Sequence, residues 1–383
     1  MTTANVRGAG HSGDRGGFGG PEGPGGTDPS ASMVRCPQCL QQFRWNTTEV
    51  YNDSGRVDLS TIHDALRREE AMHNAFVRCP GPPAQEKFPE HYLPLRYVNY
   101  GDPLVIGLVG GLSSGKTTYL AMLVDQIDRG GLARYGIEAT PLHQPKHDEY
   151  CATLSVLLAE GAPVPATPAA DQHVQFAVGY LMTNRSGHAR PVAFFDVGGE
   201  SLANMVAGST RFVRTVGALI FVVDPEQIEA RRGSLGQPSS QGDPAFSSVI
   251  NRLAPSGPGG RRLSAVPAAE VLVKSDVLRY EPLIGGWLRA DDARTPLDAV
   301  AIEHESRDVY AYLAHHGAGR WVQPFRQYSR CTLHVVSATS GGINRERNAY
   351  ARSLRPRRVL APLAAILAMT GVLEDPQAHR IGR

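Results

Sequence analysis

The glycine-rich stretch GGLSSGKT, residues 110–117, constrains the fold of this 383-residue chain more than any other segment. An apolar run, PLVIGLV over residues 103–109, comes directly before it, and apolar residues at helical spacing follow over residues 120–127. Glycine allows the left-handed backbone of a tight loop and a close approach to a neighbouring group. Successive N–H groups in such a loop form a concave anion-binding surface, which the positive end of a following helix reinforces. The segment therefore predicts a strand, an anion-binding loop and a helix, in that order.

The same loop matches the phosphate-binding pattern G-x-x-x-x-G-K-[ST]. We expect Lys116 to reach the β- and γ-phosphates of a nucleotide and to act in catalysis, and the Thr117 hydroxyl to bind Mg²⁺. The alternative is a glycine turn with an isolated lysine, which the apolar run before the loop and the helical pattern after it disfavour. Further nucleotide contacts are expected from Gly110, Ser113, Ser114, Gly115 and Thr118.

The rest of the chain favours an α/β fold with a mainly parallel sheet and helices on both faces. Short apolar runs alternate with helical segments, which is the pattern of strands connected by helices. The run at residues 173–181 alternates polar and apolar residues, as a half-exposed edge strand does. The expected strands are residues 103–109, 173–181, 191–197, 217–224, 269–276 and 331–337.

Composition divides the chain into three parts. Residues 1–33 are rich in glycine and predict a disordered tail, residues 34–98 predict a small zinc-ribbon-like module, and residues 99–375 predict the phosphate-binding domain. The formal net charge of +2 gives no reason to expect nucleic acid or a membrane surface as a partner. We expect a cytoplasmic protein, because neither a signal peptide nor an apolar run of membrane-spanning length is visible.

A second group of motif residues follows the strand at 191–197. Asp196 ends this run in AFFDVGGE, and Gly199 follows it at D-x-x-G spacing. We expect Asp196 to help hold Mg²⁺, and the Gly199 N–H to contact the γ-phosphate in a loop that responds to the loss of that phosphate. An aspartate at a strand end is also an ordinary turn residue, so this interpretation depends on the phosphate loop upstream.

A third group concerns the base. LVKSD places Lys274 and Asp276 at a strand end, and SAT follows the last strand at residues 337–339. The carboxylate of Asp276 can accept both the N1–H and the N2–H donors of guanine, which adenine cannot match. The Lys274 stem can lie along the base, and the Ala338 N–H, next to Ser337, can meet the guanine O6.

This ordered set of motifs resembles the P-loop GTPases of the translation-factor and Ras-like (TRAFAC) class. Within that class it is most similar to the bacterial double-GTPase group, through GGLSSGKTTYL, DVGGE and VVDP. The resemblance implies a GTP-binding switch with slow Mg²⁺-dependent hydrolysis, in a bacterial multi-protein system with protein partners. Two alternatives remain, which are a catalytically inactive nucleotide-binding scaffold and an ATPase with relaxed base specificity.

The sequence departs from the family pattern at several positions. Val273 stands where the guanine motif normally begins with Asn or Thr, and Glu200 stands where Ras-like proteins have the glutamine that orients water. The resemblance implies a switch threonine before the edge strand, for which Thr167 is preferred over Thr140. Arg211 and Arg214 follow D-x-x-G in STRFVRT, and we expect them to lie on a solvated helix face, although one of them could act as an internal arginine finger.

The N-terminal cysteines indicate a second metal. Cys36-x-x-Cys39 is typical of a zinc knuckle, and Cys79 in VRCP supplies a third thiolate. A fourth cysteine is missing near Cys79, so His73 or His91 would have to replace it. The alternative is a degenerate ribbon that keeps its fold without metal.

Overall fold

A computed structural model describes most of the chain and identifies the architecture. The described residues are 32–47, 49–52, 54–82, 88–111, 113–163, 174–198, 207–228, 243–253, 263–290, 297–344, 346–347, 349–350 and 354–383. Thr167, Gly199, Glu200 and nearly all of the predicted tail lie outside these ranges.

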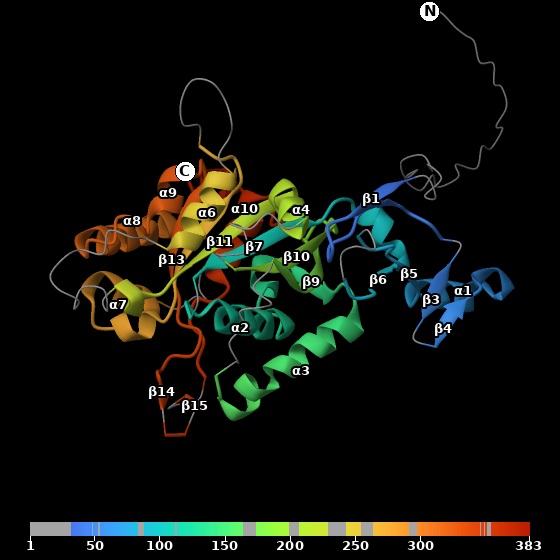
Figure 1. The fold of residues 1–383 in the computed structure, drawn as a ribbon, viewed down its shortest axis with the longest axis horizontal. Coiled ribbons are helices and arrows are strands. Elements are labelled where there is room, and N and C mark those ends of the chain that lie inside the picture. The colour runs from blue at the N-terminus through green and yellow to red at the C-terminus, as the bar shows by residue number, and fades with distance from the viewer. Residues whose placement is uncertain are drawn as a thin grey trace, which may run out of the picture.

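A seven-stranded sheet forms the centre of the molecule, with strand order β13-β12-β11-β7-β10-β9-β8 (Figure 1). Neighbouring strands from β13 to β10 pair in parallel, and β9 and β8 are antiparallel to their neighbours. The strands are β7 (Leu104–Gly110), β8 (Glu138–Pro141), β9 (Gln175–Thr183), β10 (Ala189–Gly198), β11 (Val216–Val223), β12 (Ala268–Leu272) and β13 (Cys331–Val335).

Helices cover both faces of this sheet, which confirms the predicted fold class. Successive residues of β7 point to opposite faces, with Leu104 and Ile106 in one core cluster and Val105 and Val109 in the other. The first cluster includes side chains of α2 (Lys116–Asp128), α3 (Gln144–Glu160) and α10 (Ala361–Met369). The second includes side chains of α4 (Ala207–Thr215), α6 (Pro244–Leu253), α7 (Pro282–Arg289) and α8 (Ala299–His315).

The prediction of an edge strand at residues 173–181 is wrong in one respect. β9 is the second strand from the edge, because β8 pairs with its outer side. The sequence gives little sign of β8, since the strand has four residues, ends at Pro141 and contains no continuous apolar run. The alternating pattern of β9 reflects partial cover by α3 on one face rather than an exposed edge.

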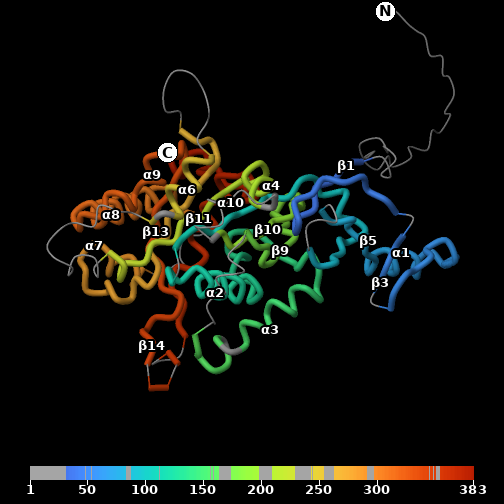
Figure 2. The backbone as a smooth tube through the Cα atoms, viewed as in Figure 1, coloured from blue at the N-terminus to red at the C-terminus, as the bar shows by residue number. Residues whose placement is uncertain are grey.

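The described residues between 33 and 100 form a smaller layer on the β9 side of the molecule (Figure 2). β1 (Met33–Arg35) and β2 (Gln42–Arg44) form a hairpin, and a separate antiparallel sheet has the order β4-β3-β5-β6. The strands of this sheet are β3 (Val50–Asn52), β4 (Gly55–Val57), β5 (Phe76–Arg78) and β6 (Tyr92–Pro94), and the helix α1 (Ala65–His73) connects β4 to β5. Trp45, Tyr97 and Leu93 fill a third apolar core here. This part of the chain therefore has a small core of its own.

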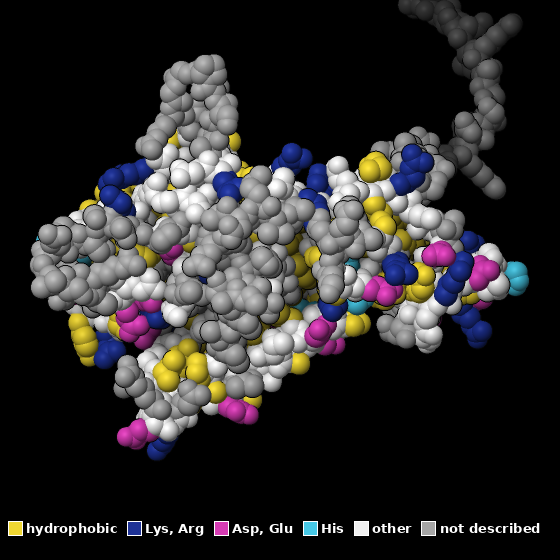
Figure 3. All heavy atoms as spheres, viewed as in Figure 1, with side chains coloured by type: hydrophobic (Ala, Val, Ile, Leu, Met, Phe, Trp, Pro, Cys, Tyr) yellow, Lys and Arg dark blue, Asp and Glu magenta, His cyan; other side chains and the backbone are white. Residues whose placement is uncertain are grey.

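Besides short 3-10 helices, the described part of the chain also contains α9 (Gln323–Gln327) and a short hairpin of β14 (Ile343–Asn344) and β15 (Ala349–Tyr350). Among the described residues, no helix combines the length and the apolar character that crossing a membrane requires. On the face drawn in Figure 3, the described basic and acidic side chains are interspersed rather than gathered into one patch.

Candidate nucleotide-binding site

The loop between β7 and α2 has the tight backbone that its glycines predict. Gly115 has φ +89° and directly precedes α2, and Ser113 also has a left-handed φ of +59°. A β-carbon placed on Gly110 would lie 2.9 Å from Ser114 Oγ and 3.0 Å from the carbonyl oxygen of Val222. Because real β-carbons do not approach other atoms so closely, the loop cannot accept a side chain at Gly110 without moving.

Lys116 folds back over this loop. Its ammonium donates to the carbonyl oxygens of Gly110 (2.6 Å) and Gly111 (3.2 Å) and lies 4.0 Å from Asp196 Oδ1. Asp196 comes from the neighbouring strand, where parallel pairing sets it level with Leu108 and sets Gly198 level with Gly110. Two motifs that are far apart in the sequence therefore meet at the carboxyl ends of two adjacent strands.

Asp196 has the features of a metal-facing carboxylate. Its Oδ1 atom is buried and has no hydrogen-bond partner within the described part of the chain. Burial raises the pKa of Asp196 above its ordinary value, although the nearby Lys116 ammonium opposes this. A buried carboxylate oxygen without a partner fits the oxygen ligands that Mg²⁺ prefers, and Thr117 in the first turn of α2 carries the second predicted ligand oxygen.

The base-recognition motifs also come together. The Ser337 hydroxyl donates to Asp276 Oδ1 at 2.7 Å and accepts from the Ser340 N–H at 3.0 Å. The Ser275 N–H donates to the carbonyl of Val336 at 3.1 Å, which ties the two loops together. The carboxylate of Asp276 is thus held in a fixed orientation next to Ala338, as recognition of a base edge requires.

Lys274 lies between the base motif and the phosphate loop and pairs with two carboxylates that follow β11. It has a left-handed φ of +51°, and its ammonium lies 2.7 Å from Asp224 Oδ2 and 3.0 Å from Glu226 Oε2. Burial raises the pKa of Asp224, while the Lys274 ammonium acts in the opposite direction. A β-carbon placed on Gly115 would lie 3.8 Å from Lys274 Cε and 3.6 Å from Val273 Cγ2. Val273 is buried beside the loop, at the position where the family pattern has an amide.

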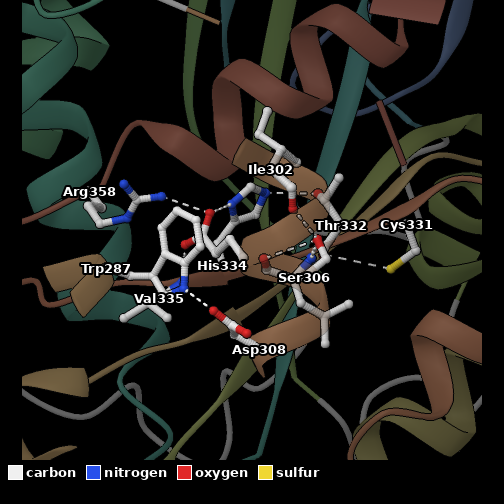
Figure 4. Close-up of polar contacts among 11 residues, drawn as sticks. Trp287, Ile302, Ser306, Asp308, Cys331, Thr332, His334, Val335 and Arg358 are labelled. Carbon is white, nitrogen blue, oxygen red and sulfur yellow. Dashed lines mark hydrogen bonds and ion pairs between the residues drawn. The ribbon is translucent and has the colours of Figure 1, made fainter. Parts of the chain in front are cut away.

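A buried network fixes the end of β13 that leads to Ser337 (Figure 4). Glu305 on α8 is completely buried and accepts hydrogen bonds from the Val335 N–H (2.8 Å) and from Arg358 Nη2 (2.7 Å). Its second oxygen also lies 3.0 Å from His334 Nδ1. Burial acts to raise the pKa of Glu305, but His334 and Arg358 outweigh it and hold the pKa below its ordinary value. The network anchors β13, the strand that leads to the SAT segment at residues 337–339.

Two residues near the site were not predicted from the sequence. Asp243 is buried, and its carboxylate accepts from the Gly111 N–H (2.5 Å) and from the Ala245 N–H (2.8 Å) at the start of α6. The dipeptide Asp243-Pro244 is a helix-start signal, but nothing in the sequence links it to the phosphate loop. Tyr350 in β15 lies near Thr118, and burial raises the pKa of Tyr350.

The structure therefore gathers every described residue that the sequence assigns to the nucleotide. These residues lie in the loop after β7, the first turn of α2, the end of β10 and the loops after β12 and β13. Thr167, Gly199 and Glu200 lie outside the described residues. The assembled set is suited to holding a phosphorylated nucleotide with its cation.

Residues 104–306, more than half of the chain, match the Double-GTPase 2 family. The chain belongs to the Double-GTPase 2 family. This confirms the predicted resemblance and identifies a GTPase-type nucleotide-binding protein. A relative in Mycolicibacterium smegmatis, named "Putative ESX-1 scaffolding and assembly protein SaeC", is 24% identical over an alignment of 292 residues. The match covers 64% of this chain and 71% of that protein.

Solved GTPase structures are also similar to this Double-GTPase 2 chain. A bacterial selenocysteine-specific elongation factor matches 62% of the chain with 14% identity and a TM-score of 0.25. The GTPase-like domain of Ski7 from S. cerevisiae matches 72% with 10% identity and a TM-score of 0.32. The chain spans 26% of the elongation factor and 51% of the Ski7 chain.

Proposed function

We propose that this Double-GTPase 2 chain binds GTP with Mg²⁺, hydrolyses it slowly and acts as a nucleotide-dependent switch. The observation that carries the proposal is the meeting of Lys116 with Asp196 at 4.0 Å, next to a base loop in which Ser337 orients Asp276. Phosphate, cation and base functions then lie side by side at one end of the sheet. In open α/β sheets this end is where ligands bind.

On the phosphate side, the loop amides and the Lys116 ammonium would hold the β- and γ-phosphates. Lys116 would exchange its bonds to the Gly110 and Gly111 carbonyls for phosphate oxygens, which carry full negative charge. Thr117 and Asp196 would hold Mg²⁺, with Thr167 as a third ligand. When bound, the cation neutralises charge on the β- and γ-phosphate oxygens.

On the base side, Asp276 would accept the two N–H donors of guanine, and the Ala338 N–H would meet O6. Ser337 supports this by keeping the Asp276 carboxylate oriented, so that less ordering is needed on binding. Val273 stands where the guanine motif normally has an amide side chain, and its apolar side chain cannot supply that hydrogen bond. We therefore expect guanine preference with moderate affinity.

For hydrolysis and switching, we assign Gly199 and Glu200 to the γ-phosphate. The Gly199 N–H would bind a γ-oxygen, and Glu200 would orient the attacking water in place of the usual glutamine. A carboxylate close to the γ-phosphate adds negative charge, so turnover is expected to be slow without a partner. The similarity to SaeC, which is named for ESX-1 scaffolding and assembly, supports a bacterial multi-protein system with protein partners.

Nucleotide titration of purified protein tests the proposal. With Mg²⁺ present, GTP should bind at micromolar concentration and ATP about 100-fold more weakly, because an adenine leaves the Asp276 carboxylate unpaired. Lys116→Ala should abolish binding, and Asp276→Asn should remove the preference for GTP. Lys146→Ala is the matched control, since Lys146 pairs with Glu149 on the exposed surface of α3.

The outcomes distinguish the alternatives. Equal affinity for GTP and ATP would replace the GTPase proposal by an ATPase with relaxed base specificity. If neither nucleotide binds, the remaining interpretation is a scaffold protein that works without nucleotide. Tight GTP binding with no phosphate release over hours would retain the switch and refute hydrolysis by this chain alone.

A further inference from the structure

Four metal-ligating side chains converge in the N-terminal layer, away from the nucleotide site. Cys36 and Cys39 come from the turn between β1 and β2, Cys79 follows β5, and His91 precedes β6. All four residues are buried, and their ligand atoms lie within 4.8 Å of one another. The elements around them belong to a small core, which is the setting in which structural metals are common.

The distances within this group place the ligand atoms around one point. Cys36 Sγ lies 3.2 Å from His91 Nε2, and Cys39 Sγ lies 3.7 Å from Cys79 Sγ. All three cysteines are free thiols in the structure. Three sulfurs and one imidazole nitrogen therefore meet without any covalent link between them.

The surrounding hydrogen bonds orient the ligands. His91 Nδ1 lies 2.9 Å from the carbonyl oxygen of Pro89, so its proton has an acceptor there and Nε2 is left facing the cysteines. The Gln38 N–H points to Cys36 Sγ at 3.3 Å, and the Gly81 N–H points to Cys79 Sγ at 3.4 Å. Main-chain donors to sulfur stabilise thiolates, the form in which cysteine binds metal.

We propose that Cys36, Cys39, Cys79 and His91 form a closed structural Zn²⁺ site. Three thiolates and one imidazole are a common zinc ligand set, and soft sulfur ligands select against Mg²⁺ and Ca²⁺. Four protein ligands complete a tetrahedron, so the site has no open position for a substrate. The structure thus replaces the missing fourth cysteine by His91. His73, the other histidine that the sequence offered, is exposed at the end of α1 and is not part of the group.

The knuckle between Cys36 and Cys39 touches the helix that follows the D-x-x-G segment. Arg211 on α4 is partly buried, and its Nε donates to the Cys39 carbonyl oxygen at 3.1 Å. The prediction of a solvated helix face is therefore wrong for Arg211, whereas Arg214 is exposed. The next residue, Leu40, has a left-handed φ of +61° and is buried in the core that α4 also joins. Zinc therefore holds a loop that packs against α4, and its loss should loosen this contact.

Elemental analysis of the full chain tests the site. Wild-type protein should carry about one zinc per chain, and His91→Ala or Cys79→Ser should lower this at least about tenfold. Cys331→Ala is the matched control, because Cys331 is a buried cysteine in β13 outside the group, and it should keep its zinc. Cys151→Ser tests a second group of Asp128, His147 and Cys151, and it should also keep zinc.

A measurement on wild-type protein covers the case in which the variants fail to fold. Replacement of zinc by Co²⁺ should give the absorption bands of a tetrahedral ion with sulfur ligands. Hydrogen exchange in α4 should become faster when the metal is removed by a chelator. Zinc-free wild-type protein, zinc lost in Cys151→Ser but kept in His91→Ala, or an octahedral cobalt spectrum would each overturn the proposal. None of these results depends on nucleotide binding.

Discussion

Asp243 offers a test of how the phosphate loop is held in place. Its buried carboxylate accepts from the Gly111 N–H and also caps α6 through the Ala245 N–H. Asp243→Ala leaves the Gly111 N–H without a partner, which costs about 1–3 kcal/mol. Loss of the helix cap costs about 0.5–2 kcal/mol more. The free energy of unfolding should therefore fall by roughly 1.5–5 kcal/mol in total.

The assay compares this variant with a cap that has no link to the loop. Asp298 caps α8 through the Val300 and Ala301 N–H groups and is not among the residues assigned to the nucleotide site. Asp298→Ala removes only a helix cap, so chemical unfolding should show a free energy of unfolding lower by about 0.5–2 kcal/mol. The affinity for GTP should be unchanged. Asp243→Ala should lower the free energy of unfolding by more than Asp298→Ala does. It should also weaken GTP binding about tenfold, because the loop amides lose their fixed orientation. Equal effects of the two variants on stability and affinity would refute this role of Asp243.

Three further predictions follow from the same geometry. Ser337→Ala should weaken GTP about fivefold and leave ATP unchanged in nucleotide titrations, since one hydrogen bond that orients Asp276 is worth about 1 kcal/mol; equal weakening of both would contradict this. The pKa of Asp196 is raised in the folded state, so its ionised form destabilises the fold above the unfolded-state pKa. Asp196→Asn should therefore raise the melting temperature of nucleotide-free protein at pH 7 and remove the Mg²⁺ dependence of GTP binding; a lower melting temperature would count against it. The pKa of Glu305 is lowered, so its stabilisation is present above the unfolded-state pKa and is lost as the pH falls through the folded-state pKa. Glu305→Gln should lower stability at pH 7 by about 3–5 kcal/mol, and the difference from wild type should shrink in acid denaturation.

The parallel part of the sheet could be predicted because its signals are local. Residues 103–127 contain an apolar run, a glycine loop and a helical repeat, and each predicts its own element without long-range information. Strand ends of a parallel sheet meet at one edge, so motifs after successive strands were expected to gather there. The family match over residues 104–306 confirms the resemblance that these motifs indicated.

What could not be predicted depends on contacts between distant residues. Asp243 and Gly111 are 132 positions apart, and the sequence around Asp243 indicates only the start of a helix. β8 is too short to produce a periodic pattern. His91 could not be distinguished from His73 by spacing, because the choice depends on how β5 and β6 pair. The sequence around Arg211 is typical of a surface helix, and its hydrogen bond to the Cys39 carbonyl oxygen joins residues 172 positions apart.

The most direct test of the central claim is the identification of nucleotide in gently purified protein. The chain should be purified quickly with Mg²⁺, denatured, and its released small molecules separated and quantified. The geometry of Lys116, Asp196 and Asp276 predicts GDP or GTP in the wild type at a substantial fraction of the protein concentration, and none in Lys116→Ala. Adenine nucleotide instead of guanine nucleotide would contradict the assigned base, and a wild type that neither carries nucleotide nor takes up added GTP would contradict the nucleotide site itself.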